Sequence, residues 1–535
     1  MNLNNCPSDI ILTISSYLDN STNLQLRLLS RSLHDSVTPT ALRHAYLAFN
    51  KLKIQESENL IQTCRSRLPN LSRYVQHLTT DVQGWYIARH VPEESLPDLW
   101  EILSSFTSLK SLTMSWKFGI EVDPETEVRI RDMQVGIASA LMKATGGRLE
   151  TLIIHPPSGE LLIPKPLLDV RGLVEFEVVY ERDAWFCNRT KPTDGEPEHS
   201  CKCRLGALTT ALESILPSNP GLETLTLVCG CNGTGYPIQH VFLPQMTNLH
   251  SISMRGLNPT SISTLVPPGA LRNIRHVDFQ SDHWAFNLDP LWKSMKAAGT
   301  TLESLSTAQV SLDLVEFIAS FSGLNKLKLF NIQSGELSSS EKITSTFWDI
   351  ALPRHAPTLE MLSISWMIDV DHIPGWAFNR IAWTPILSKM VMLKSLHIHP
   401  DPSTMPSYST HTDSVPMVAS SYQAILDAVQ VLPSLESLEI YWSTRSFGPA
   451  RKSVWIKASR KVLGEAAKRL WCAGETLRPM ELCLFNEKYF ASVVEQEEGG
   501  EVFWTYRPSK ASTYHLGRCV NLRGFLLSNI DYYRS

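Results

Sequence analysis

Four cysteines in two close pairs are the residues of this sequence best suited to holding a metal ion. The pairs are Cys201 with Cys203 and Cys229 with Cys231. Four thiolates can hold zinc tetrahedrally, and such a site would tie the loop at 182–204 against the strand that comes after it. Paired zinc ligands, however, are usually separated by two or more residues, and Cys229 continues an inward alternation that suits a plain core thiol. Both interpretations stay open, and we expect no bound cofactor.

Sequence motifs of the common catalytic sites are absent. The chain contains no Walker-type phosphate loop, no His-Glu-x-x-His pair and no Gly-x-Ser-x-Gly elbow. Its 16 histidines and 53 acidic residues are spread along the sequence, where such residues more often lie on surfaces than in one assembled site. We therefore expect a non-catalytic protein. An enzyme or metal protein built around the cysteine-rich loop is the more remote alternative.

The composition favours other proteins as partners. Of the 535 residues, 43% are hydrophobic and 19% are charged, so the chain can bury a large core. A formal net charge of -4 gives no basic excess for binding a phosphate backbone, and we expect no nucleic-acid partner. The segment 1–8 lacks a signal-peptide pattern, and no apolar run reaches the roughly 20 residues that cross a bilayer. We expect no membrane partner and a cytoplasmic or nuclear location, or both.

A strand-like pattern, Leu-x-x-Leu-x-Leu, recurs through most of the chain. Its third position is apolar in every copy except the one with Thr307, and the residue after its first position is charged in ten of thirteen copies. Such alternation is typical of a short strand with one face packed inward and the other facing water. Val75 begins a degenerate first copy, and the full copies begin at Leu109, Leu149, Leu173, Leu222, Leu249, Ile274, Leu302, Leu324, Leu359, Leu393, Leu435, Leu477 and Leu522.

Segments with helical spacing separate these strands, at 127–143, 208–216, 314–321, 422–431 and 457–471. Strand, turn, helix and return form one unit of a right-handed α/β solenoid, with parallel strands on its concave face and helices outside. The distance between successive copies runs irregularly from 22 to 49 residues. We therefore predict a solenoid over 49–535 with inserted loops near 181–206, 401–421 and 486–511.

Alternate strand residues would line the concave face of this solenoid, where partners usually bind. This mixed, partly aromatic surface suits a protein ligand, although each residue taken singly fits a solvated sheet face better than a binding site. The candidate target-facing residues are Arg255, His276, Asp278, Lys326, Lys328, Phe330, His397, His399, Glu439 and Tyr441.

Residues 1–48 predict a separate helical module. Ser8 can cap a helix, and Asp9 suits the positive end of its dipole. One broad apolar stripe of that helix consists of Ile10, Ile11, Ile14, Tyr17 and Leu18. After a break at 19–21, there is a second, leucine-rich segment. These short helices carry more apolar surface than so small a unit can bury alone.

The segments Cys6–Asp19 and Leu24–Asp35 together resemble an F-box. Pro7 matches the proline of that family, while Cys6 replaces a usual leucine and Leu33 a common tryptophan. The resemblance implies that the module docks on a Skp-family adaptor, which joins it to a cullin scaffold. The alternative is that the same side chains pack on the downstream solenoid. The positions that match the family's adaptor contacts are Pro7, Ile10, Ile14, Leu18, Leu24 and Leu28.

The F-box and the repeats together predict a substrate receptor of an SCF-type cullin-RING ubiquitin ligase. The repeats downstream of the F-box are similar to a degenerate leucine-rich-repeat solenoid of the ribonuclease-inhibitor type. In this hypothesis the solenoid holds an unknown target protein, and other subunits carry out ubiquitin transfer for protein degradation. The alternative is a leucine-rich-repeat scaffold outside any ligase, with the helices serving only as a cap. The identity of the target, and any dependence on phosphorylation, lie beyond the sequence.

Overall fold

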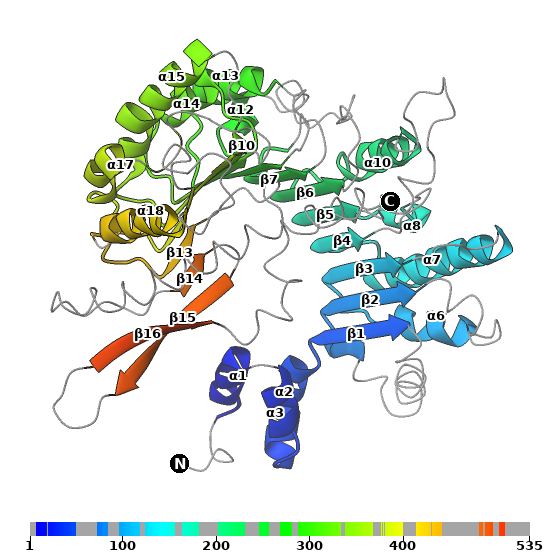
Figure 1. Cartoon of the computed structure of the whole chain (residues 1–535). Coiled ribbons are helices and arrows are strands. Elements are labelled where there is room, and N and C mark those ends of the chain that lie inside the picture. Colours follow the sequence, from blue (N-terminus) through cyan, green and yellow to red (C-terminus); the bar gives the residue numbers. More distant parts are fainter. Residues whose placement is uncertain are drawn as a thin grey trace. The chain divides into compact units, whose positions relative to one another are not determined.

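The computed structural model divides the chain into two compact units, Met1–Asn273 and Ile274–Ser535. Each unit alternates strands and helices (Figure 1). The residues that the structure describes are 7–18, 20–49, 72–83, 96–117, 124–155, 163–180, 202–229, 246–255, 268–280, 287–332, 337–366, 376, 378, 380–399, 414–429, 431–440, 481–484, 487–495 and 502–508.

The first unit begins with three helices and continues as a parallel sheet. The helices are α1 (Ser8–Tyr17), α2 (Asn20–Leu26) and α3 (Arg31–Ala41). Each strand pairs in parallel with the next one along the chain, so every connection must cross back over the sheet. The strands are β1 (His44–Phe49), β2 (His77–Gln83), β3 (Ser111–Lys117), β4 (Thr151–His155), β5 (Glu175–Tyr180), β6 (Thr224–Cys229) and β7 (Ser251–Arg255).

Equivalent positions of the repeated pattern lie opposite each other across these strands. The residues on either side of each apolar position point to the other face and are partly exposed, as the alternating burial along β4 and β7 shows. This confirms the alternation expected from the sequence. The second apolar position forms one buried row, which consists of Leu78, Leu112, Leu152, Phe176, Leu225 and Ile252.

Helices α6, α7, α8 and α10 lie along one side of the first unit's strands (Figure 1). The helices expected at 127–143 and 208–216 are confirmed by α7 and α10. The helical elements after α3 in this unit are η2 (Ser72–Tyr74), α6 (Leu96–Ser104), α7 (Pro124–Thr145), α8 (Lys165–Leu168), α10 (Lys202–Ile215) and α12 (Pro268–Leu271).

Gly136 allows α6 and α7 to approach closely. A Cβ atom at this position would lie 2.5 Å from Cζ2 of Trp100, well inside normal contact distance. We expect Gly136→Ala to lower the free energy of unfolding by about 1–3 kcal/mol, because overpacking outweighs the roughly 1 kcal/mol that alanine gains over glycine in a helix. Gly269→Ala in α12 is the matched control, since open space surrounds that helical glycine. Urea unfolding measures both, and equal stability of the two variants would contradict the close approach.

The second unit has the same parallel pattern over most of its strands and ends with antiparallel ones. Strands β9 to β14 pair in parallel, as do β8 and β9, whereas β15 pairs antiparallel with both β14 and β16. Two strands therefore occupy the segment expected to be a loop near 486–511. The strands are β8 (His276–Gln280), β9 (Ser304–Thr307), β10 (Lys326–Ile332), β11 (Met361–Trp366), β12 (Ser395–Ile398), β13 (Ser437–Ile440), β14 (Glu481–Leu484), β15 (Glu487–Glu495) and β16 (Val502–Pro508).

Aromatic side chains join the buried strand face of the second unit to its helices. Phe279 of β8 lies 6.1 Å from Trp292 between ring centroids, and Trp292 stacks on Phe317 at 5.9 Å. Helices α14 and α18 confirm the helical segments expected at 314–321 and 422–431, while 457–471 lies outside the described residues. The helices are α13 (Asp289–Ala298), α14 (Leu312–Ile318), α15 (Leu337–Thr346), the π-helical η5 (Phe347–Ala351), α16 (Leu352–His355), α17 (Arg380–Leu387) and α18 (Ser414–Val429).

A buried asparagine ties neighbouring repeats of the first unit together. Asn219 donates hydrogen bonds from Nδ2 to the carbonyl oxygens of Val170 at 2.9 Å and Ile215 at 2.7 Å. Its Oδ1 accepts the backbone N–H of Leu173 at 2.8 Å. Leu173 begins the preceding copy of the strand pattern, and Asn219 lies just before the next copy. The side chain thus satisfies backbone groups that the turns leave without a partner.

His355 makes the equivalent connection in the second unit. Its Nδ1 accepts the backbone N–H of Leu324 at 3.1 Å, so its Nε2 carries the proton and donates to the carbonyl oxygen of Ile318 at 3.0 Å. Leu324 also begins a copy of the strand pattern. Burial is the main cause that lowers the pKa of His355, which keeps the ring neutral in this position.

The charged residue that follows the first apolar site of the repeated pattern lies beside its counterpart in a neighbouring copy. Lys110 and Glu150 form an ion pair at 2.8 Å, and Lys394 and Glu360 form one at 3.2 Å. The backbone N–H of Glu150 also donates to the carbonyl oxygen of Lys110 at 2.7 Å. Exposed pairs of this kind contribute little stability each. The position is charged because it is solvent-facing and because neighbouring repeats place opposite charges side by side.

The predicted fold class is confirmed at the level of an α/β repeat architecture with parallel strands and intervening helices. The right-handed coil, the leucine-rich-repeat family and the division at residues 48 and 49 stay predictions. The last helix of the N-terminal module ends at Ala41, and β1 begins at His44. The segments near 181–201 and 401–413 lie outside the described residues, whereas 202–206 and 414–421 belong to α10 and α18.

Candidate functional site

The three N-terminal helices enclose a small core of their own. Ile11, Leu33, Val37 and Ala41 are buried together, and Leu26 packs against them. Ser30 begins α3 as its N-cap, because its Oγ accepts the backbone N–H of Leu33 at 3.2 Å. The module therefore has an inside and an outside that are set by its own sequence.

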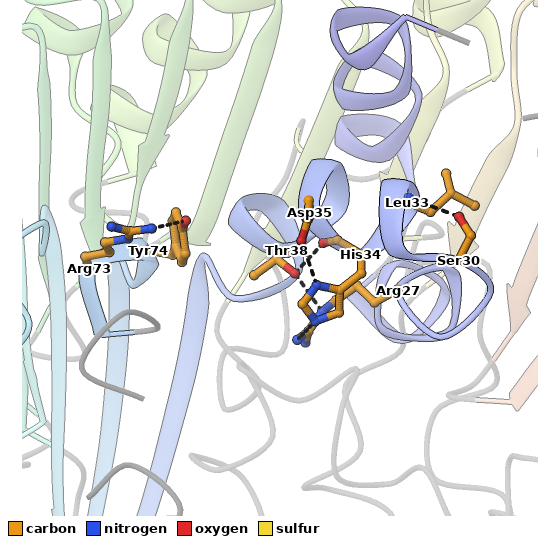
Figure 2. A network of polar contacts seen from close by, with 8 residues as sticks. All are labelled: Arg27, Ser30, Leu33, His34, Asp35, Thr38, Arg73 and Tyr74. Atoms are coloured by element: carbon orange, nitrogen blue, oxygen red, sulfur yellow. Dashed lines mark hydrogen bonds and ion pairs between the residues drawn. The ribbon is translucent and has the colours of Figure 1, made fainter. Parts of the chain in front are cut away.

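Polar contacts fix the angle between α2 and α3 (Figure 2). Arg27, the residue next to the end of α2, donates from Nε to Oγ1 of Thr38 at 3.0 Å, and its guanidinium lies 3.4 Å from the ring of His34. Asn23 of α2 donates from Nδ2 to the carbonyl oxygen of Ser15 at 2.8 Å. Figure 2 also shows Arg73 and Tyr74 of η2 in contact with each other. The contacts of Arg27 and Asn23 hold α1, α2 and α3 as one body.

The outer surface of the module carries several large apolar side chains. Ile10, Ile14 and Tyr17 recur three or four residues apart on α1 and are 48%, 41% and 86% exposed. Leu28 and Leu29, in the turn before α3, are 85% and 68% exposed. Apolar side chains gathered in this way are typical of a surface that a partner covers. We refer to these five residues as the apolar patch.

The expected adaptor contacts divide among several environments. Ile10, Ile14 and Leu28 belong to the apolar patch, and Pro7 is exposed beside α1. Leu18 is partly buried, and the side chain of Leu24 lies outside the described residues. Sequence reasoning did not assign Tyr17 and Leu29 to the contact set. The spacing did place Tyr17 in the apolar stripe of the first helix, and its exposure now adds it to the candidate contacts.

A two-residue connection joins the module to the sheet. The carbonyl oxygen of Arg43 accepts the backbone N–H groups of Gln76 and His77 at 2.9 and 3.0 Å. His44 of β1 stacks on His77 of β2 with ring centroids 4.5 Å apart and an interplanar angle of 14°. Burial is the first cause that lowers the pKa of both rings, and the positive charge of Arg43 adds to it. The stack is therefore one of neutral rings at pH 7.

The face of each sheet opposite the buried rows carries polar side chains, and we refer to it as the open face. In the first unit, Glu175 and Glu177 both lie on the open face of β5. Burial raises the pKa of Glu177, and the neighbouring Glu175 adds to the shift. Arg255, one of the candidate target-facing residues, is the last residue of β7.

Most of the other candidate residues lie on the open face of the second unit. Asp278 of β8, Lys328 of β10, His397 of β12 and Glu439 of β13 occupy one row of the strand register. His276 and Lys326 lie in the adjacent row. These six residues lie on the strand face expected from the sequence alternation, and their contact with a target stays a prediction.

Phe330, His399 and Tyr441 complete the candidate set. Phe330 is partly buried on β10. His399 is 7% exposed, and burial lowers its pKa to about 3, so it belongs to the interior rather than to a solvent-facing surface. Tyr441 lies outside the described residues.

Ser395, His397 and Glu439 form a series of polar contacts that has the order of a nucleophile, a base and a carboxylate. Oγ of Ser395 lies 3.0 Å from Nε2 of His397, whose Nδ1 lies 3.7 Å from Oε2 of Glu439. Acyl transfer also requires N–H donors that are free to hold an oxyanion. The N–H of Ser395 instead donates to the carbonyl oxygen of Glu360, and β12 is paired on both sides. The N–H of Ser395 is therefore not available to hold an oxyanion.

The cysteine pairs lie outside the part of the chain that the structure describes in side-chain detail. Cys203 belongs to α10 and Cys229 to β6, while Cys201 and Cys231 fall in undescribed segments. Among the described residues, three or more potential metal ligands do not gather anywhere. Structural zinc and plain core thiols therefore both stay predictions.

Comparison with known proteins adds no family assignment. No protein-family model matches the sequence, and no curated protein is found to be similar to it. Within the described part of the chain, no helix combines the length and the apolar character needed to cross a membrane.

Proposed function

We propose that the chain is the substrate receptor of an SCF-type cullin-RING ubiquitin ligase, in which the N-terminal module docks on a Skp-family adaptor and the repeats hold a target protein. The observation that carries this proposal is the apolar patch. The module buries Ile11, Leu33 and Val37 in its own core and yet leaves large apolar side chains in water. Such a surface is costly for a free protein and favourable once a partner covers it.

The shape of the patch suits a partner that has an apolar groove. Ile10, Ile14 and Tyr17 form a ridge along α1, which is the arrangement used when a helix inserts into a groove. Leu28 and Leu29 add two exposed apolar side chains in the turn before α3.

Co-purification with a Skp-family adaptor tests the proposal. We expect the double variant Ile10→Asp, Leu28→Asp to retain less than about a tenth of the adaptor, because each change would bury a carboxylate in an apolar contact. The matched control is Val128→Asp, Val135→Asp on α7, where the valines are also exposed, at 57% and 43%. The control should capture as much adaptor as the wild type.

Circular dichroism and thermal unfolding establish that both double variants remain folded. If the Ile10→Asp, Leu28→Asp variant captures adaptor as well as the wild type does, the docking role is wrong. If the control variant loses the adaptor to the same extent, the binding surface lies elsewhere on the first unit.

A scaffold outside any ligase is the second candidate, and the connection between the module and the sheet favours it. The carbonyl oxygen of Arg43 pairs with β2, and η2 packs near α3, so the helices also serve as a cap for the first strands. A cap of this kind would leave adaptor capture at background in the wild type. The same co-purification therefore separates the two functions.

A further inference from the structure

Two lysines lie next to each other on the open face of β10 in the second unit. Lys326 is exposed and Lys328 is partly buried. Because alternate residues of a strand point to the same face, their Cα atoms are about 6.6 Å apart along the strand. Neither ammonium group has an ion-pair or hydrogen-bond partner among the residues that the structure describes. The two positive charges are therefore available to a ligand.

Serines flank the lysines on both neighbouring strands. Ser304 and Ser306 of β9 lie opposite Lys326 and Lys328, and Ser363 of β11 lies opposite Lys328 on the other side. We refer to these five residues as the lysine seam. Hydroxyl and ammonium groups are both hydrogen-bond donors, so the seam presents several donors in a small area.

Ser306 gives independent evidence that the seam is incomplete without a ligand. It is 8% exposed, and its Oγ has no hydrogen-bond partner among the described residues. The strand register places its side chain on the open face, between Asp278 and Lys328. A buried hydroxyl without a partner is uncommon because it loses the hydrogen bonds that water would supply.

The nearby acidic side chains are occupied by other partners. Asp278 accepts hydrogen bonds from Nε2 of Gln280 at 2.9 and 3.0 Å. Glu439 lies beside His397, with 3.7 Å between Oε2 and Nδ1. Neither of these acids forms an ion pair with Lys326 or Lys328 among the residues that the structure describes.

We propose that the lysine seam binds an oxyanion on an extended segment of another protein, either a phosphate ester or a pair of carboxylates. Two ammonium groups match the charge of either ligand, and the Ser306 hydroxyl supplies a donor that has no other use. The role of that protein as a degradation target rests on the proposed function. The binding chemistry itself does not.

Fluorescence anisotropy with the full-length chain tests the proposal. The probes are three labelled peptide libraries of otherwise random sequence, with a central phosphoserine, a central Glu-Glu pair, or a central unmodified serine. We expect one of the two anionic libraries to bind at least tenfold more tightly than the serine library, and binding to weaken as salt is added. Preference between the anionic libraries identifies the source of the oxyanion. Inorganic phosphate should compete at millimolar concentration if phosphoserine is preferred.

Substitution of the seam completes the test. Lys326→Gln, Lys328→Gln should abolish the preference for the anionic library, and Ser306→Ala should weaken binding several-fold. The matched control is Lys342→Gln, Lys389→Gln, which removes the same charge from two exposed lysines of the second unit. Lys342 belongs to α15, and Lys389 lies just after α17. Equal binding of all three libraries, or equal loss in the control variant, would overturn the proposal.

Adaptor capture by the wild-type chain separates this inference from the proposed function. If the chain captures the adaptor but distinguishes none of the libraries, the seam is not an oxyanion site and the ligase proposal stands. If it selects an anionic library but captures no adaptor, the oxyanion site stands and the ligase proposal fails.

Discussion

Replacing His355 by alanine should lower the free energy of unfolding by about 4 kcal/mol. The imidazole is fully buried and bridges the N–H of Leu324 and the carbonyl oxygen of Ile318. Without it, each of these backbone groups loses its partner, at a cost of about 1–3 kcal/mol apiece. The ring also packs edge-on against Phe321, with centroids 5.0 Å apart, so its removal leaves a cavity as well.

Urea unfolding followed by circular dichroism measures this loss. The control is His276→Ala, because His276 belongs to the same unit but its side chain is 44% exposed. We expect the control to change the stability by less than about 0.5 kcal/mol. A loss at His355 no larger than that of the control would show that the buried bridge contributes nothing to the fold.

The strands could be predicted from sequence because their signal is local. Side chains of a strand alternate with a period of two, so the buried row and the open row are both readable from a few consecutive residues. The same signal was present but weaker at β1, where the copy reads Leu42, Ala45 and Leu47 with a small residue at its second position. Search by leucine spacing alone therefore missed the first strand.

Strands β15 and β16 were missed for a different reason. The acidic and glycine-rich run near 496–501 favoured a loop, and the expectation extended that loop over the flanking segments. Those segments contain Val493, Val494, Phe503 and Trp504, which are good strand formers. Their antiparallel pairing depends on one another and on β14, so no single copy of the repeat pattern could reveal it.

The polar bridges could not be predicted, because they depend on distances between repeats. Asn219 and His355 are separated by 46 and 31 residues from the N–H groups of Leu173 and Leu324 that they bind. A hint was present, since each bridge lies three or four residues before a leucine that begins the next copy. Because the spacing between copies is irregular, the two polar residues could not be recognised as equivalent positions of a repeat.

The candidate surfaces were predicted in type but not in detail. The sequence placed Ile10, Ile11 and Ile14 in one apolar stripe, whereas the structure turns Ile11 into the module's core and leaves the other two in water. Which part of a broad stripe is buried depends on how α1 sits against α3, and that is a tertiary property.

His399 should make the protein less stable in acid. Its pKa is about 3 in the folded protein because burial opposes the charged ring, whereas an unfolded histidine has a pKa near 6.5. Between these values the unfolded state binds a proton that the folded state does not. The stability contributed by the neutral ring is therefore complete above pH 6.5 and is lost as the pH falls towards 3.

We expect His399 alone to account for a fall of about 2 kcal/mol in the free energy of unfolding between pH 6.5 and 4.5, because the unfolded histidine is already half protonated at pH 6.5 and each further pH unit corresponds to about 1.4 kcal/mol. Urea unfolding of the wild type and of His399→Leu at constant ionic strength measures it. Other histidines with a lowered pKa, such as His355, act in the same direction in both proteins and cancel in the difference. The variant should therefore show a shallower pH dependence than the wild type, because leucine has no proton to gain. Parallel curves for the two proteins would mean that His399 is accessible to protons in the folded state, and the interior position assigned to it would be wrong.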